Sequence, residues 1–332
     1  TALFFSAPEP DRVIFTANAT DGLNMALLGM LKEKDHVVTT MLEHNSVLRP
    51  LTHLQQERGV TLSFLPFDDR GIVAVDKLAP LLEAKKTALV VVNHASNVLG
   101  TVQPVEKIGK ICAAHGVPLL IDASQSAGLV PVSMKAIGAS AIAFTGHKSL
   151  YAPSGIGGLV IHPELDIQPV RFGGTGTVSK DLSHPQDFPE RLEAGTHNLM
   201  GIIGLSLALD AFLEDQGNLH KWHEKEMHLA TRLYNALSQL PRVQLYGGDM
   251  TLPHVALFSM AVDGMAAGDV GTVLDGDFDI AVRTGLHCAP LVHKLLGTIN
   301  TGATRFSFGR YNTEDDVNAV IHAMERITHS LN

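Results

Sequence analysis

Short apolar runs alternate with longer segments in which apolar residues recur every three to four positions, over about the first two thirds of the chain. Runs at residues 88–92, 117–121 and 141–144 predict buried strands, whereas the apolar spacing within 23–31 and 105–115 predicts helices. Because strand and helix alternate, we predict an α/β fold with a mostly parallel sheet and helices on both of its faces.

Polar residues gather where the predicted strands of this region end. His44 follows one strand, Asn97 follows the next buried run, Asp122 ends another, and Lys148 lies just beyond the strand after that. In open α/β sheets, ligands bind at the carboxyl ends of the strands. We therefore expect a binding site at this edge of the sheet.

The pattern changes in the last third of the chain. Short apolar runs there predict strands at residues 243–246, 255–260, 280–282 and 304–308. A helical pattern over 314–329 closes the chain. This α+β texture predicts two domains, a large one at residues 1–212 and a smaller C-terminal one at 213–332.

Composition narrows the classes of function. The chain has 332 residues, of which 45% are hydrophobic and 18% charged, as in a globular protein with a sizeable core. The net charge of −9, without basic clusters, argues against a nucleic-acid partner. No apolar stretch reaches the roughly 18 residues of a membrane span, and no signal-peptide pattern is present. Two cysteines without Cys-x-x-Cys spacing predict no disulfide framework and no metal site, so we expect a cytoplasmic protein.

Several motifs of other enzyme classes are absent. No Gly-x-Gly-x-x-Gly joins a predicted strand to a helix, and Gly146-His147-Lys148-Ser149 lacks the spacing of a Walker A loop. Neither Gly-x-Ser-x-Gly nor His-Glu-x-x-His occurs. The motifs therefore favour neither a dinucleotide-binding enzyme nor a hydrolase.

Asp122 and Lys148 form a pair that pyridoxal 5'-phosphate (PLP) chemistry requires. A lysine forms a Schiff base with the aldehyde, and a carboxylate keeps the ring nitrogen protonated so that the ring accepts electrons. Residues 18–22 would supply a helix start whose free N–H groups bind the phosphate. From these residues alone, Lys148 as an exposed strand-end lysine and 18–22 as an ordinary capped helix start stay open as alternatives.

Three segments together carry a resemblance to a known family. They are Asp-Ala-Ser-Gln at 122–125, Thr-Gly-His-Lys at 145–148 and Arg-Thr-Gly-Leu-His-Cys-Ala-Pro at 283–290. In this order they resemble the signatures of cysteine desulfurases, in the class V branch of fold-type I PLP enzymes, over residues 13–327. The short loop after the third segment resembles the Suf-like group, which includes selenocysteine lyases. The resemblance implies a mostly parallel seven-stranded sheet in a PLP-binding large domain, followed by a smaller C-terminal domain.

The resemblance also implies which residues hold the cofactor. In the family pattern, matching positions contact PLP: Lys148 as the Schiff-base lysine, Asp122 at the pyridine nitrogen, Gln125 and Asn97 near the ring hydroxyl, His44 stacked on the ring, and Ala19, Thr20, Thr145 and His147 on the phosphate side. Thr196 matches a residue that reaches the phosphate in the neighbouring subunit, which implies a homodimer.

For the reaction, the resemblance implies conversion of L-cysteine to L-alanine with a persulfide on Cys288. Arg305, with Asn97, would hold the substrate carboxylate, and Lys148 and His44 would complete the catalytic set. The family context implies sulfur mobilisation, for example for iron–sulfur cluster assembly, and a sulfur-acceptor protein. Alternatives are a selenocysteine lyase, a cysteine or cystine lyase, another class V aminotransferase-like enzyme, or a non-catalytic scaffold with the same fold.

The sequence departs from the family pattern near its start. Members of the resembled family carry a segment ahead of the first strand found here, which begins at about Val13. We therefore expect that this N-terminal segment, with part of the substrate pocket, is missing. Asn18-Ala19-Thr20 is also a variant of the family's phosphate-binding segment.

Overall fold

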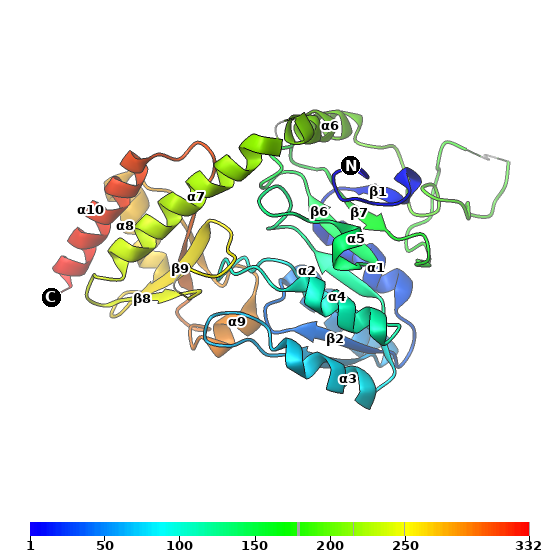
Figure 1. Ribbon diagram of the computed structural model, residues 1–332, viewed down its shortest axis with the longest axis horizontal. Coiled ribbons are helices and arrows are strands. Elements are labelled where there is room, and N and C mark those ends of the chain that lie inside the picture. The colour runs from blue at the N-terminus through cyan, green and yellow to red at the C-terminus, as the bar shows by residue number, and fades with distance from the viewer. Residues whose placement is uncertain (178–179, 215, 249, 332) are drawn as a thin grey trace. The chain divides into compact units, whose positions relative to one another are not determined.

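The computed structural model describes residues 1–177, 180–214, 216–248 and 250–331 (Figure 1). They divide into two compact units. The first unit comprises Thr1–Pro66, Ala74–His94 and Pro104–Gln216, and the second comprises Phe67–Val73, Ala95–Gln103 and Gly217–Asn332. Two short segments from the first third of the chain thus belong with the C-terminal part. The predicted functional domains, 1–212 for cofactor binding and 213–332 as the smaller C-terminal domain, stay a prediction.

The first unit contains a seven-stranded sheet with the order β1-β7-β6-β5-β4-β2-β3. Neighbours from β3 through β2, β4 and β5 to β6 are parallel, and β7 runs antiparallel to both β6 and β1. The strands are β1 (Val13–Thr16), β2 (His36–Thr40), β3 (Thr61–Leu65), β4 (Thr87–Asn93), β5 (Leu119–Asp122), β6 (Ala141–Thr145) and β7 (Gly157–Ile161). The prediction of a mostly parallel seven-stranded sheet is confirmed.

Helices cover both faces of this sheet. The chain crosses the sheet in one direction from β1 through β2 to β3, and it returns in the other direction from β3 through β4 and β5 to β6. Because crossovers between parallel strands are right-handed, α1 and α2 lie on one face of the sheet and α3, α4 and α5 lie on the opposite face (Figure 1). The helices are α1 (Ala19–Met30), α2 (Asn45–Arg58), α3 (Leu78–Ala84), α4 (Val105–Ala114), α5 (Met134–Ile137) and α6 (Leu199–Glu214), with short 3-10 turns η1 (Pro10–Arg12) and η2 (Val75–Lys77).

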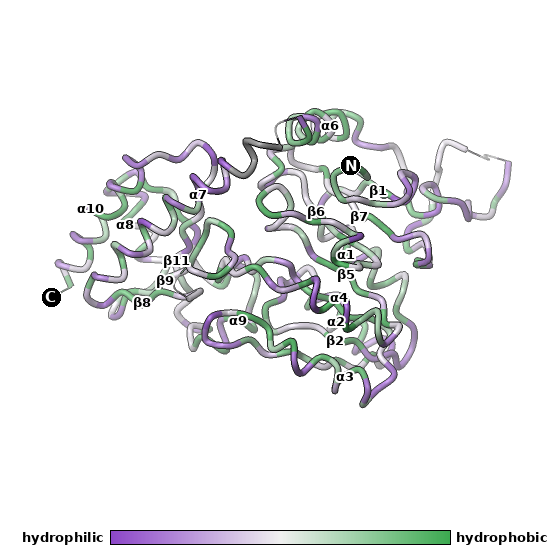
Figure 2. Tube along the Cα trace, in the orientation of Figure 1, coloured by the Kyte–Doolittle hydropathy of each residue, from purple (hydrophilic) through white to green (hydrophobic). Residues whose placement is uncertain are grey.

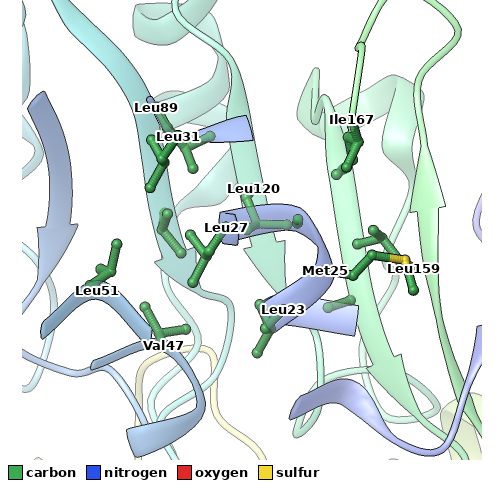
Figure 3. Packing of buried hydrophobic residues seen from close by; sticks show 14 of the residues in the cluster. Leu23, Met25, Leu27, Leu31, Val47, Leu51, Leu89, Leu120, Leu159 and Ile167 are labelled. Atoms are coloured by element: carbon green, nitrogen blue, oxygen red, sulfur yellow. The ribbon is translucent and has the colours of Figure 1, made fainter. Parts of the chain in front are cut away.

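The core of the first unit lies between the sheet and helices α1 and α2. Leu23 and Leu27 of α1 are fully buried and lie over Leu120 of β5 (Figure 3). Leu159 of β7 and Val47 of α2 belong to the same buried cluster. Parallel strands covered on both faces are apolar almost throughout, which is why short apolar runs were sufficient to predict them.

The second unit packs helices against a four-stranded antiparallel sheet with the order β10-β11-β9-β8. Leu233, Phe258 and Met324 lie in its core. Its elements are α7 (Gln216–Leu237), β8 (Val243–Tyr246), β9 (Leu257–Val262), α8 (Ala267–Phe278), β10 (Arg283–Gly285), α9 (Pro290–Leu295), β11 (Ala303–Ser307) and α10 (Glu314–Ser330). Thr313 and Asp316 form a capping box at the start of α10.

Two local predictions in this unit need correction. The strand predicted at 280–282 is wrong, because pairing with β11 begins only at Arg283. Helix α8 was not predicted, since its glycines and aspartates obscure the helical pattern. Packing explains the glycine at position 271, because a Cβ there would lie 2.6 Å from Cγ2 of Thr284. Close approach of α8 to β10 therefore requires a residue of low helix propensity.

Candidate active site

The parallel strands of the first unit bring predicted site residues to one edge of its sheet. Strands β2, β4, β5 and β6 all run in the same direction, so their carboxyl ends meet at this edge. Asp122 is the last residue of β5, and Lys148 lies three residues after the end of β6. His44 lies four residues after the end of β2. The structure thus groups these three residues on neighbouring strand ends.

The Asp122 carboxylate is held in a fixed orientation. Asp122 is only 5% exposed, and its Oδ1 accepts hydrogen bonds from the backbone N–H of Ser124, at 2.9 Å, and from the Ser124 hydroxyl. Its main-chain carbonyl accepts from the N–H of His94, at 2.9 Å. Ser124 was not predicted as a site residue, although the spacing Asp-x-Ser is the signal for such a turn. The result is a buried carboxylate with little freedom to rotate.

Two polar residues close to the predicted lysine in the chain, Thr145 and His147, contact each other. The hydroxyl of Thr145 lies 3.0 Å from Nδ1 of His147, and Lys148 is half-buried. Partial burial, with the positive charge of Lys148 as a second cause, lowers the pKa of His147. His147 is therefore favoured as a neutral imidazole that can exchange hydrogen bonds without adding charge beside Lys148.

The structure determines the tautomer of His44. His44 is the N-cap of α2, and its Nδ1 accepts a hydrogen bond from the backbone N–H of Ser46, at 3.0 Å. A neutral imidazole that accepts at Nδ1 carries its proton on Nε2. The side chain is half-buried. Because Nδ1 caps the helix as an acceptor, the neutral ring carries its donor N–H at Nε2.

The start of α1 is suited to binding an anion. Asn18 is the N-cap and accepts from the N–H of Asp21, at 3.1 Å. Ala19 and Thr20 occupy the first two helical positions, whose N–H groups have no intrahelical partner. Because β1 is parallel to β6 through the intervening antiparallel β7, this helix start lies at the same edge of the sheet as Lys148.

A small pocket joins this helix start to the predicted intersubunit residue. The pocket has a volume of about 190 Å³, and its lining includes Ala17, Asp21, Arg171 and Thr196. Arg171 forms an ion pair with Asp21, at 3.5 Å. Thr196 is exposed, and Gln125 is half-buried in the turn that follows β5. Thr196 and the α1 start are thus neighbours within one unit.

The second unit brings together the remaining three predicted residues. The side-chain amide of Asn97 donates to the backbone carbonyl of His287, at 2.6 Å, and Nη1 of Arg305 donates to the backbone carbonyl of Asn97, at 3.0 Å. Cys288 follows His287 directly and is half-buried. One buried asparagine therefore connects the arginine on β11 with the segment that carries the thiol.

A second arginine lies beside Arg305. Arg283 is directly opposite Arg305 in the β10–β11 pair, so both side chains stand on one face of the sheet. Burial, together with the charge of Arg283, lowers the pKa of Arg305 to about 10. Within the part of the chain that the structure describes, no acidic side chain forms an ion pair with either arginine. Such an unneutralised pair favours a carboxylate ligand. Arg283 begins the third family segment but was given no role from the sequence, because only the strand register sets it opposite Arg305.

The segment with the thiol has an unusual backbone. His287 and Cys288 have φ values of 49° and 57°, a left-handed conformation that non-glycine residues rarely adopt. Burial, followed by the charges of Arg305 and other neighbours, lowers the pKa of His287 to about 3, so this histidine is neutral. Strained residues persist only where surrounding structure holds them, and they concentrate at functional sites.

The fold and these strand-end residues are typical of an α/β enzyme whose ligand site lies at the carboxyl edge of its sheet, and the sequence comparison identifies the family. The chain matches the aminotransferase class-V family over residues 1–320 and belongs to it. A probable cysteine desulfurase from Halalkalibacterium halodurans is 35% identical over 97% of this chain and 79% of its own length. A cysteine desulfurase from Cronobacter sakazakii is 34% identical over 98% of this chain and 80% of its own length.

Solved structures give the same result. The apo cysteine desulfurase from Thermococcus onnurineus NA1 has a TM-score of 0.90 and 35% identity, covering 99% of this chain and 82% of that chain. A cysteine desulfurase from Escherichia coli has a TM-score of 0.89 and 28% identity over the same shares. The predicted resemblance and the fold-type I architecture are therefore confirmed, and the chain is an enzyme of this kind.

Two further properties of the described residues concern membranes and metal ions. None of their helices combines the length and the apolar character needed to cross a membrane. No group of three or more histidine, cysteine or acidic side chains among them is arranged to hold a metal ion.

Proposed function

We propose that this chain is a PLP-dependent cysteine desulfurase that converts L-cysteine to L-alanine and leaves a persulfide on Cys288. The observation that carries the proposal is the hydrogen-bonded connection from Arg305 through Asn97 to the His287 carbonyl. It couples a carboxylate-binding arginine to the segment with a half-buried thiol. The relatives named cysteine desulfurase support the same assignment.

The residues of the first unit fit PLP. A buried carboxylate with a fixed orientation, Asp122, suits a protonated ring nitrogen, and the α1 start suits a phosphate. Lys148 would hold the cofactor covalently, and when bound PLP would supply the electron sink for chemistry at the α-carbon of an amino acid. We therefore assign residues 1–212 as the PLP-binding domain, with Gln125, Thr145 and His147 as further contacts.

Side chains of this protein would bind the substrate, transfer protons and accept the sulfur. Arg305 and Arg283 bind the substrate carboxylate, and the Lys148 amine moves the α-proton. Cys288 attacks as a thiolate: an S–S bond forms to the substrate sulfur while the Cβ–S bond of the substrate breaks. The electron pair left on the substrate carbon takes up a proton, which Nε2 of a neutral His44 would donate. The products are alanine and a persulfide on Cys288.

Product analysis with two variants tests the proposal. We expect wild-type protein loaded with PLP to release alanine from cysteine and to carry a persulfide. Cys288→Ser keeps the lysine-linked cofactor absorbance but forms no persulfide, whereas Lys148→Ala loses that absorbance. Cys112→Ala, at the buried thiol of α4, is the matched control and keeps activity. Pyruvate as the product would identify a lyase instead, and a keto acid formed with a second substrate would identify an aminotransferase.

We also propose a homodimer. Helix α6 is hydrophobic along much of its trace (Figure 2), and Leu199, Met200, Ile203 and Leu207 are each between 53% and 77% exposed. Thr196 lies just before this helix, so a second copy on this face would receive Thr196 near its own cofactor site. We expect Ile203→Glu with Leu207→Glu to yield a monomer in sedimentation experiments, while Thr196→Ala stays dimeric and binds PLP more weakly.

The location and partners follow from this chemistry. A free thiol nucleophile requires a reducing compartment, so we place the protein in the cytoplasm. A persulfide on Cys288 is a product only when something accepts its sulfur, and we expect an acceptor protein to do so. Release of selenium from selenocysteine at a higher rate than sulfur from cysteine would instead identify a selenocysteine lyase.

A further inference from the structure

Glu43 is a fully buried acid that the mechanism above does not use. It lies between the end of β2 and the start of α2, and it is 0% exposed. Its Oε1 accepts two hydrogen bonds, from the Thr40 hydroxyl at 2.6 Å and from the backbone N–H of Asn93 at 3.0 Å. The Asn93 amide in turn donates to the carbonyl of Leu42, at 3.1 Å. Glu43 thus ties the end of β2 to the end of β4.

This position places Glu43 between two residues of the proposed site. It directly precedes His44 in the chain, and Asn93 pairs with Asp122 in the β4–β5 register. Its second carboxyl oxygen, Oε2, is buried and has no hydrogen-bond partner within the described residues. Burial of an ionised carboxylate with such an oxygen costs far more free energy than burial of the neutral acid.

The charges around Glu43 also favour the neutral acid. The carboxyl group of Asp122, from β5, opposes a negative charge on Glu43. His94, beside Asn93, is kept neutral, because burial lowers its pKa to about 4. Burial, which outweighs the hydrogen bonds to Oε1, raises the pKa of Glu43 to about 8. Two neighbouring buried carboxyl groups resist ionising together.

We propose that Glu43 is a positioning residue whose hydrogen bonds fix the strand end that carries His44 and whose buried, neutral carboxyl group adds no negative charge beside Asp122. The proposal rests on the PLP-dependent function proposed above. When Glu43 ionises, it adds a negative charge beside Asp122, and the environment of the cofactor changes.

Three variants separate the charge of Glu43 from its hydrogen bonds. Glu43→Gln keeps the shape and an oxygen acceptor but cannot ionise. Glu43→Asp keeps the acid on a shorter side chain. Thr40→Val removes a donor that favours the ionised form, so it moves any ionisation of Glu43 to higher pH, by about one pH unit for a hydrogen bond to a charged group.

The first measurement follows the visible absorbance of bound PLP from pH 6 to pH 10. We expect wild type to show a transition near pH 8 that is absent in Glu43→Gln and shifted to higher pH in Thr40→Val. Any change of absorbance with pH that remains in Glu43→Gln comes from other titrating groups, and it is subtracted from the wild-type profile. The same pH profile in wild type and Glu43→Gln would overturn the proposal.

The second measurement needs no cofactor and keeps the two proposals distinguishable. Glu43 has a raised pKa in the folded state, so its protonated form contributes stability that is present below about pH 4.5 and is lost as the pH rises towards 8. In denaturant unfolding without PLP, Glu43→Gln should therefore gain stability relative to wild type between pH 5 and pH 8. Failure of wild type to bind PLP would refute the proposed function, whereas a pH-independent stability difference would refute a neutral Glu43. If Glu43→Gln does not fold, the shift in Thr40→Val decides.

Discussion

His94 should make the first unit sensitive to acid. The side chain is only 3% exposed, its Nδ1 has no hydrogen-bond partner among the described residues, and burial lowers its pKa from 6.5 to about 4. In the unfolded chain the same imidazole takes up a proton near pH 6.5. As the pH falls from 6.5 to 4, the unfolded state therefore binds a proton that the folded state excludes, and stability is lost over this window.

The expected size of this effect follows from the two pKa values. A difference of about 2.5 pH units corresponds to about 3 kcal/mol once the pH is below about 4 and both states bind the proton. Between pH 7.5 and pH 5 the loss amounts to about 2 kcal/mol by the same relation. Because His94 is buried, solvent screening does not reduce this figure substantially.

Denaturant unfolding of wild type and His94→Gln at several pH values, at constant ionic strength and without cofactor, measures the effect. We expect the stability of His94→Gln relative to wild type to rise by about 2 kcal/mol between pH 7.5 and pH 5. His53→Gln, at an exposed histidine on α2, is the control for losing one imidazole. A difference between wild type and His94→Gln that stays constant with pH would refute the reasoning, whatever its size at neutral pH.

Other substitutions test the remaining structural arguments. Gly100 has a φ of 79°, and a Cβ there would lie 2.1 Å from Cε1 of His254. Gly100→Ala should therefore lower the free energy of unfolding by about 3 kcal/mol or more in denaturant unfolding. Gly276→Ala is the control, because a Cβ there meets open space and should not lower it. Asn18→Ala removes the N-cap of α1 and should cost about 1 kcal/mol and weaken PLP binding in a titration. Arg305→Lys loses the two-pronged donor and should raise the KM for cysteine by about tenfold with a smaller change in kcat.

Local pattern was sufficient for the first unit's sheet and for much of its site. Strands β4, β5 and β6 are apolar runs because parallel strands are covered on both faces, and the polar residue that ends such a run must lie at the edge of the sheet. Asp122 and Lys148 could therefore be placed on neighbouring strand ends from the sequence. The family resemblance added Arg305 and Cys288, which composition and spacing alone would have left as ordinary residues.

Features that depend on pairing between distant segments could not be predicted from the local sequence pattern. Arg283 gains its meaning from the register that sets it opposite Arg305, and Asn97 from a hydrogen bond to a residue 190 positions away. Glu43 follows a strand like many exposed acids, and nothing in its local pattern indicates that it is fully buried. Periodicity along the chain reports which face of an element is buried. The charge state of a single side chain depends on neighbours that folding brings to it from other strands, and the pattern along one strand does not contain them.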